Sequence, residues 1–146
     1  MRRAWWLLFL AANLLASSPS CFAQDELFVS NSNSNAITVY VRTANGNAAP
    51  IRVLAGAATG LSSPSGIAVD LVNDELYVVN KTVPYAVTVY PRTASGNTAP
   101  LRTIVGAATT LDDPRGIAVD TVHGEISVAN RAGFSVTTWA RTANGD

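Results

Sequence analysis

Residues 64–80 read PSGIAVDLVNDELYVVN, and residues 114–130 repeat the same pattern as PRGIAVDTVHGEISVAN. The repeat extends beyond this stretch, because residues 36–79 match residues 86–129 at more than half of their positions. Internal periods of about 20 to 50 residues are typical of solenoids, propellers and other repeat arrays. The fold is therefore predicted from the repeat first and from local patterns second.

Each period of the repeat contains four short segments with the composition of β-strands. They are rich in Val, Ile, Thr and Tyr, and Gly, Pro, Asn or Asp stand at their ends. In the central copy these segments are residues 66–70, 75–80, 86–92 and 100–106. No stretch after residue 24 shows a sustained apolar period of about 3.6 residues, the period of a helix. The sequence predicts an all-β protein.

The predicted strands are apolar on both faces. In residues 75–80, Leu76 and Tyr77 point to opposite sides of the sheet, so the sheet needs cover on both sides. Four-stranded units that need a neighbour on each face are the blades of a β-propeller. The small residues Gly66 and Gly116 favour an innermost strand, where blades crowd together.

The two long copies resemble NHL-repeat β-propellers, which carry a proline-glycine-apolar-aspartate strand followed by a Tyr-Val-Ala-Asp-like strand. Two features depart from that family. Asn31, Asn80 and Asn130 stand where the family usually has aspartate, and the RTANGN segment at residues 42–47 lengthens the period. The resemblance implies antiparallel four-stranded repeats of about 50 residues that form a propeller.

The strand count predicts an incomplete propeller of about two and a half blades, where closed rings have about four to eight. The predicted units are a partial blade (residues 25–56), a full blade (64–106) and a partial blade (114–146). The third RTANG phrase breaks off at Asp146, so we expect a fragment of a longer propeller. The alternative is a short chain that completes its ring by self-association.

Residues 1–23 have the order of a secretory signal peptide. Arg2 and Arg3 precede an apolar run, and small residues precede the predicted cleavage site after Ala23. We therefore expect export to the periplasm or the extracellular space, with no membrane span in the mature chain. The only cysteine, Cys21, leaves with this segment, so no disulfide is expected.

The charges exclude some partners. Removing Arg2 and Arg3 from the ten basic residues leaves eight, against ten acidic residues, and these are spread singly. Such a surface has no basic patch for nucleic acid. We expect no nucleic-acid partner.

The sequence offers no catalytic constellation. Asp70 and Asp120 recur at the same position of each copy, which predicts that they accept backbone N–H groups in the following turn. Asn80 and its equivalents are expected to fix the next loop in the same way. His123 is the only histidine and aligns with a turn residue, Asn73, so it is predicted to be solvated. No cofactor and no metal ligand are expected.

The loops that differ between copies are the predicted binding positions. They lie between the second and third strands and before each GIAVD strand, and in propellers that this chain resembles these loops share one face. Basic, acidic and aromatic side chains there suit a protein or carbohydrate ligand. The alternative is sequence drift without any ligand. The candidate ligand-binding residues are Lys81, Tyr85, Asp112, Asp113, Arg115, Arg131 and Phe134.

These observations predict an exported, non-enzymatic binding scaffold. The alternative is a fragment of a gluconolactonase-like propeller hydrolase, whose relatives hold a metal in the central channel. Repeated Asp and Asn residues are its only support, with calcium as the ion that such oxygen ligands would take. A rise of melting temperature with calcium would favour this alternative.

Overall fold

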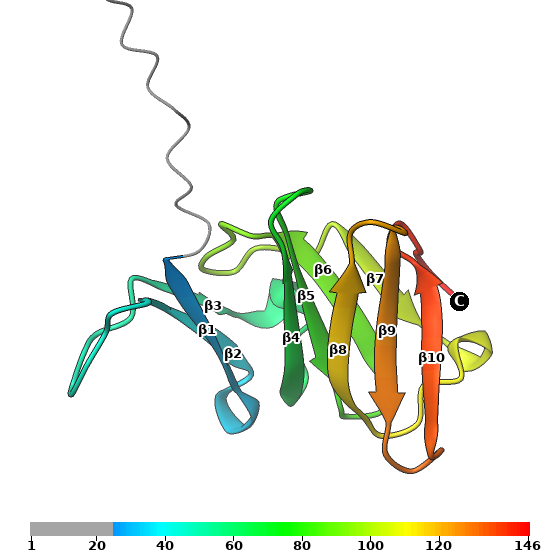
Figure 1. Ribbon diagram of the computed structural model, residues 1–146. Helices are drawn as coiled ribbons and strands as arrows, with labels where there is room; N and C mark the ends of the chain where they lie inside the picture. Colours follow the sequence, from blue (N-terminus) through cyan, green and yellow to red (C-terminus); the bar gives the residue numbers. More distant parts are fainter. Residues whose placement is uncertain (1–24) are drawn as a thin grey trace, which may run out of the picture.

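The computed structural model describes residues 25–146, which form ten β-strands in three antiparallel sheets (Figure 1). The N-terminal sheet has the order β1 (Glu26–Asn31), β2 (Ala36–Val41), β3 (Arg52–Ala55). The central sheet has the order β4 (Pro64–Asp70), β5 (Glu75–Asn80), β6 (Ala86–Pro91), β7 (Arg102–Val105). The C-terminal sheet has the order β8 (Pro114–Asp120), β9 (Glu125–Asn130), β10 (Ser135–Ala140). Short 3-10 turns are η2 (Ser32–Ser34), η3 (Ala57–Thr59) and η4 (Ala107–Thr109).

The all-β prediction is confirmed for this part of the chain, as is the count of three, four and three strands. The predicted signal peptide lies outside the described residues. From residue 25 onward, no helix has the length and apolar character needed to cross a bilayer. The last strand of the central sheet is shorter than predicted and spans Arg102–Val105. The first begins earlier, at Pro64, with an irregular register between Pro64 and Ile67.

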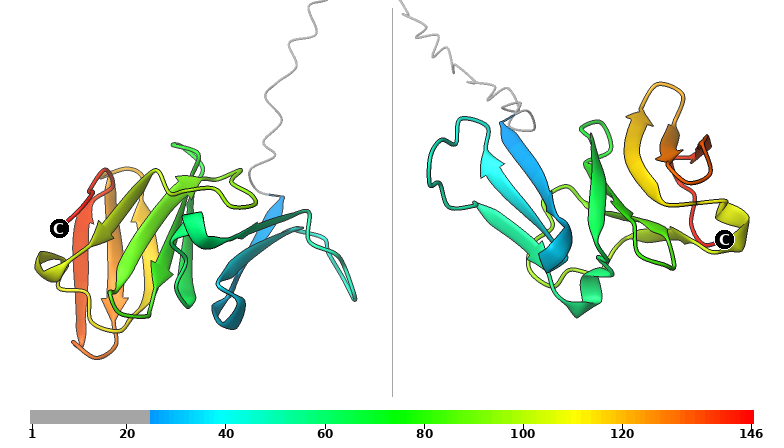
Figure 2. Two further views of the ribbon diagram at one scale, coloured as in Figure 1. Left: turned by 180° about the vertical axis from the view of Figure 1, so that it is seen from behind. Right: turned by 90° about the horizontal axis from the view of Figure 1, so that it is seen from below.

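The central sheet is covered on both faces, as its sequence predicts. Figure 2 shows the three sheets side by side, each turning a face to the next. On one face of the central sheet, Leu76 and Val78 pack in a cluster with Ile37 and Leu54 of the N-terminal sheet. Each such side chain contributes roughly 1.5 to 3 kcal/mol when fully buried. This contact joins the first two sheets.

The other face of the central sheet contacts the C-terminal sheet. Tyr77 and Val79 are fully buried there with Ile126 and Val128. Neighbouring side chains along β5 thus point into two different clusters. The alternation predicted from ELYVVN is confirmed.

The first strands of the central and C-terminal sheets, β4 and β8, approach each other closely. A Cβ atom on Gly66 would lie 2.5 Å from the carbonyl oxygen of Arg115 and 3.1 Å from the Cα of Gly116. Only glycine fits at residue 66 without moving the backbone of β8. The predicted crowding is therefore confirmed at Gly66.

Ion pairs cross from one sheet to the next at equivalent positions. Glu26 of β1 binds Arg52 of its own sheet through two hydrogen bonds, at 2.5 and 3.0 Å. It also accepts a hydrogen bond from Nη1 of Arg92, which follows the third strand of the central sheet, at 2.8 Å. All three side chains are largely buried. We call this arrangement a Glu–Arg joint.

The second Glu–Arg joint repeats the first between the central and C-terminal sheets. Glu75 binds Arg102 of its own sheet at 2.8 and 2.9 Å, and Arg141 of the next sheet at 2.7 Å. The hydroxyl of Tyr77 donates to Glu75 at 2.5 Å. Burial acts to raise the pKa of Glu75, but the hydrogen bonds from Arg102 and Tyr77 outweigh it and lower the pKa to about 2. Glu75 is therefore ionised in the folded protein.

The second and third RTANG segments each tie their sheet to the one before it. In the second copy, Gly96 exchanges backbone hydrogen bonds with Val53 and Ala55 of β3, and Oδ1 of Asn97 accepts the N–H of Ala58 at 2.7 Å. We call this contact the clasp. It adds a short parallel bridge to the outer strand of the preceding sheet.

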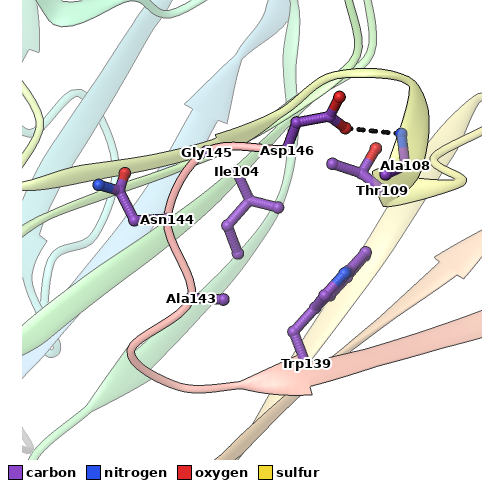
Figure 3. A pocket seen from close by; sticks show the side chains of 8 residues that line it. All are labelled: Ile104, Ala108, Thr109, Trp139, Ala143, Asn144, Gly145 and Asp146. Carbon is purple, nitrogen blue, oxygen red and sulfur yellow. Dashed lines mark hydrogen bonds between the residues drawn. The ribbon is translucent and has the colours of Figure 1, made fainter.

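The third copy forms the same clasp on the central sheet (Figure 3). Gly145 pairs with β7, and Oδ1 of Asp146 accepts the N–H of Ala108 at 2.6 Å. Ile104 and Trp139 line a hollow of about 250 Å³ beside this contact. Both clasps use a glycine with positive φ, 60° at Gly96 and 82° at Gly145, a conformation that glycine adopts without steric cost.

We expect Asn97→Ala to lower the free energy of unfolding by about 1 kcal/mol, because the N–H of Ala58 loses its acceptor. Asn47→Ala is the matched control, since Asn47 is the equivalent residue of the first copy and is exposed. That variant should stay within about 0.5 kcal/mol of the parent. Urea unfolding followed by circular dichroism measures both. If both variants lost the same free energy of unfolding, the contact between Asn97 and Ala58 would be contradicted.

Candidate functional site

The predicted variable loops lie at one edge of the three sheets, which we call the loop edge. Figure 1 shows the β1–β2 and β9–β10 connections at the lower side of the molecule. The segments before β4 and β8 reach the same edge, because these strands pair antiparallel with β5 and β9. The loop edge comprises residues 31–35, 62–65, 81–85, 112–115 and 131–134.

Hydrogen bonds join these loops across the sheets. The N–H of Ser63 donates to Oδ1 of Asn35 in the N-terminal sheet at 2.7 Å. Within the central sheet, the N–H of Lys81 donates to the carbonyl of Ser63 at 3.3 Å. Ser65 Oγ donates to the carbonyl of Pro114 in the C-terminal sheet at 3.4 Å. The loop edge is therefore one connected surface.

The asparagines that end the second strands hold this edge in place. Oδ1 of Asn80 accepts the N–H of Ser62 at 2.8 Å, and Oδ1 of Asn130 accepts that of Asp112 at 3.1 Å. Through Oδ1 they fix the loop before the first strand of their own sheet, which the sequence analysis did not predict. The antiparallel pairing of the first two strands brings that earlier loop beside the asparagine. Through Nδ2 they also bond across the next loop, to Thr88 and Thr137. Asn31 makes the same Nδ2 bond in the N-terminal sheet, to Oγ1 of Thr38 at 3.0 Å.

Three candidate residues come together in the C-terminal sheet. Asp113 binds Arg115 at 2.9 Å and Arg131 at 2.5 Å. Desolvation acts to raise the pKa of Asp113, but hydrogen bonds from Arg115 and Arg131 outweigh it, so the pKa lies below its usual value. Arg131 remains 70% exposed and can still reach a ligand. The cluster carries two positive charges and one negative charge.

The other candidates lie at the loop edge without joining this cluster. Phe134 is 95% exposed and has a positive φ of 47°, which holds the tight loop after β9. Lys81 and Tyr85 belong to the neighbouring loop of the central sheet and are half-buried. Asp112 is exposed, and its carbonyl accepts the N–H of Ala132 in the loop after β9. The structure thus places all seven candidates on one edge, in two adjacent loop sets.

The first loop adds residues that the sequence analysis did not select. Asn31, Ser32, Asn33 and Ser34 line an open hollow of about 440 Å³ at the loop edge. Their hydroxyl and amide groups are donors and acceptors suited to polar ligands. The only sequence signal for this hollow was the alternation of Ser and Asn in SNSNSN, and the same composition is typical of an ordinary turn.

The repeated aspartates lie at the opposite edge and have the predicted role. Oδ1 of Asp70 accepts two N–H groups of the following turn, both at 2.8 Å. Oδ1 of Asp120 accepts those of Val122 and His123, at 2.9 and 3.0 Å. Both aspartates therefore hold tight turns.

His123 is exposed, as predicted, and bonds to the turn aspartate. Its Nδ1 lies 2.6 Å from Oδ2 of Asp120, and the equivalent Asn73 donates to Asp70 at 2.7 Å. The hydrogen bond with Asp120 raises the pKa of His123, and the same bond lowers the pKa of Asp120. Between residues 25 and 146, no three His, Cys, Asp or Glu side chains gather as a metal site would require.

No protein-family model matches the chain, and no curated protein matches it at a significant level. The described residues define the class as an all-β protein of three antiparallel sheets, built on an internal repeat. The resemblance to NHL propellers stays a prediction from the motifs.

Proposed function

We propose that this chain is an exported, non-enzymatic β-propeller module that binds a protein or carbohydrate through its loop edge. The proposal rests on one observation, which is that the loops with variable sequence also form one continuous surface. The loops that differ most between copies are the ones that hydrogen bonds join into one surface. Repeat proteins vary their binding loops while the scaffold stays constant.

The composition of the loop edge supports this function. Phe134 is almost fully exposed, and Arg131 lies three residues earlier in the same loop. Aromatic and arginine side chains are enriched at binding surfaces and contribute much of their energy. The polar hollow at residues 31–34, in the N-terminal sheet at the same edge, adds hydrogen-bonding groups.

The packing of the sheets supports the propeller architecture. Each sheet turns a face to the next, and the first strands of the central and C-terminal sheets approach most closely, at Gly66. In a propeller, the first strand of each blade lies nearest the axis. The order of residues 1–23 supports export.

An oligosaccharide array and a random peptide library, screened with the full chain, test the binding proposal. We expect ligands whose affinity falls about tenfold or more in Phe134→Ala, because a central aromatic anchor is lost. Val122→Ala is the matched control, since Val122 is 86% exposed on the same sheet at the opposite edge. Ligands that bind Phe134→Ala and the parent equally would contradict the loop edge as the site. Calcium-dependent lactone hydrolysis would overturn the non-enzymatic proposal.

A further inference from the structure

The N-terminal sheet has an apolar face that nothing covers within residues 25–146. Leu27 is 50% exposed on this face, beside the half-buried Tyr40. The equivalent residues of the central sheet, Leu76 and Tyr90, are buried against the N-terminal sheet. A shallow hollow of about 320 Å³ lies over the exposed residues. This face is therefore one half of a sheet-to-sheet contact.

Arg42 carries the charged half of the same contact. It pairs with Asp25 at 3.3 Å, just as Arg92 pairs with Asp74 at 2.7 Å. However, Arg92 also reaches across to Glu26 in the preceding sheet. The side chain of Arg42 is 66% exposed, against 14% for Arg92. Arg42 thus occupies the arginine position of a Glu–Arg joint, but within residues 25–146 it has no glutamate of a preceding sheet to bind.

Glu125 presents the complementary half at the other end of the described chain. It occupies the position of Glu26 and Glu75, each of which binds two arginines. Glu125 is exposed, and no ion pair to it occurs among the described residues. It begins β9 on the outward face of the C-terminal sheet, where Val136 is 67% exposed. The glutamate of a Glu–Arg joint is therefore exposed on the C-terminal sheet, and the arginine of such a joint is exposed on the N-terminal sheet.

We propose that a second copy of this chain docks head to tail on the first. The N-terminal sheet of one copy covers the outward face of the C-terminal sheet of the other, and Arg42 binds Glu125 across the contact. This arrangement repeats the geometry that the two internal Glu–Arg joints already show. Because the two surfaces differ, the contact is heterologous, and it builds rings or open chains of copies.

The outward face of the C-terminal sheet is less apolar than the equivalent face of the central sheet, so the ion pair is the most specific element of the proposed contact. Ser127 and Thr138 stand where the central sheet has the larger Tyr77 and Val89. Ser127 and Thr138 also hydrogen bond to each other at 2.9 Å. The apolar complement to Leu27 is therefore smaller than at the internal contacts, and charge complementarity selects the orientation.

Analytical ultracentrifugation of the full chain over a range of concentrations tests the proposal. We expect assembly of the parent, and dissociation constants at least about tenfold weaker for Arg42→Glu and for Glu125→Arg, since each places like charges together. The double variant should assemble again with the charges exchanged, as should an equimolar mixture of the single variants. Lys81→Glu is the control, because it reverses a charge on the loop edge, away from the contact.

Circular dichroism confirms that each variant is folded before its assembly is compared. A parent that stays monomeric at the highest concentrations overturns the proposal. So does a result in which Arg42→Glu weakens assembly and Glu125→Arg does not, because the N-terminal faces would then pair with each other. Failure of the folded double variant to assemble would overturn the Arg42–Glu125 pair.

Discussion

Replacing Gly66 by alanine should lower the free energy of unfolding by about 3 kcal/mol, the upper part of the range for overpacked sites. The added Cβ would meet the carbonyl oxygen of Arg115 at 2.5 Å and the backbone of residues 116 and 117 at 3.1 Å. These are backbone atoms of β8, so no side chain can rotate away. The central and C-terminal sheets would have to separate, and the Tyr77 cluster between them would lose its packing.

Gly116→Ala is the matched control for this prediction. Gly116 occupies the same position of the next copy, but the nearest atom to its added Cβ is the Cβ of Ala129, at 3.9 Å. That distance is an ordinary contact, so we expect a change within about 1 kcal/mol. Chemical unfolding monitored by circular dichroism provides both values. If the two glycines tolerate alanine equally well, β4 and β8 do not pack as described.

Replacing Glu75 by glutamine should cost about 3 kcal/mol at neutral pH. The carboxylate is shared by Arg102 and Arg141, and both guanidinium groups would remain largely buried without their counter-charge. Glu125→Gln is the control, because the same residue type at the equivalent position is exposed and lacks these partners. Measured where the chain is monomeric, it should change stability by less than about 0.5 kcal/mol.

Glu75→Gln should also change how the stability of the protein depends on acid pH. The pKa of Glu75 is about 2 in the folded protein, below the ordinary glutamate value of 4.5. A depressed folded-state pKa stabilises the protein above the unfolded value, and this stabilisation is lost as the pH falls from about 4.5 toward about 2. Unfolding midpoints between pH 7 and pH 2.5 should therefore fall less steeply in Glu75→Gln than in the parent. Parallel pH profiles would argue against the joint at Glu75.

The repeat made much of the fold predictable. The alternation in ELYVVN correctly assigned Leu76 and Tyr77 to opposite covered faces, because strand side chains alternate with a strict period of two. The recurrence of Asp70 and Asp120 correctly predicted turn residues, because a short carboxylate after a strand reaches the next N–H groups.

The candidate site was predictable only as a set of loops. Sequence comparison between copies selected the loops that differ, and antiparallel pairing then placed them at one edge. The pairing of Asp113 with both Arg115 and Arg131 could not be predicted, because side-chain direction in irregular loops has no fixed period. The hollow at residues 31–34 was missed for the same reason.

The sequence by itself determined the strands, their order and the faces that need cover, since these follow from local alternation and from the repeat. Only the tertiary structure decided how neighbouring sheets are joined. Glu26 and Arg92 are 66 residues apart in the chain, and Asn97 lies 39 residues from Ala58. Contacts of this kind depend on the approach of two sheets, which no local pattern encodes. The same geometry distinguishes Glu75, which is held by two arginines, from the identical but exposed Glu125.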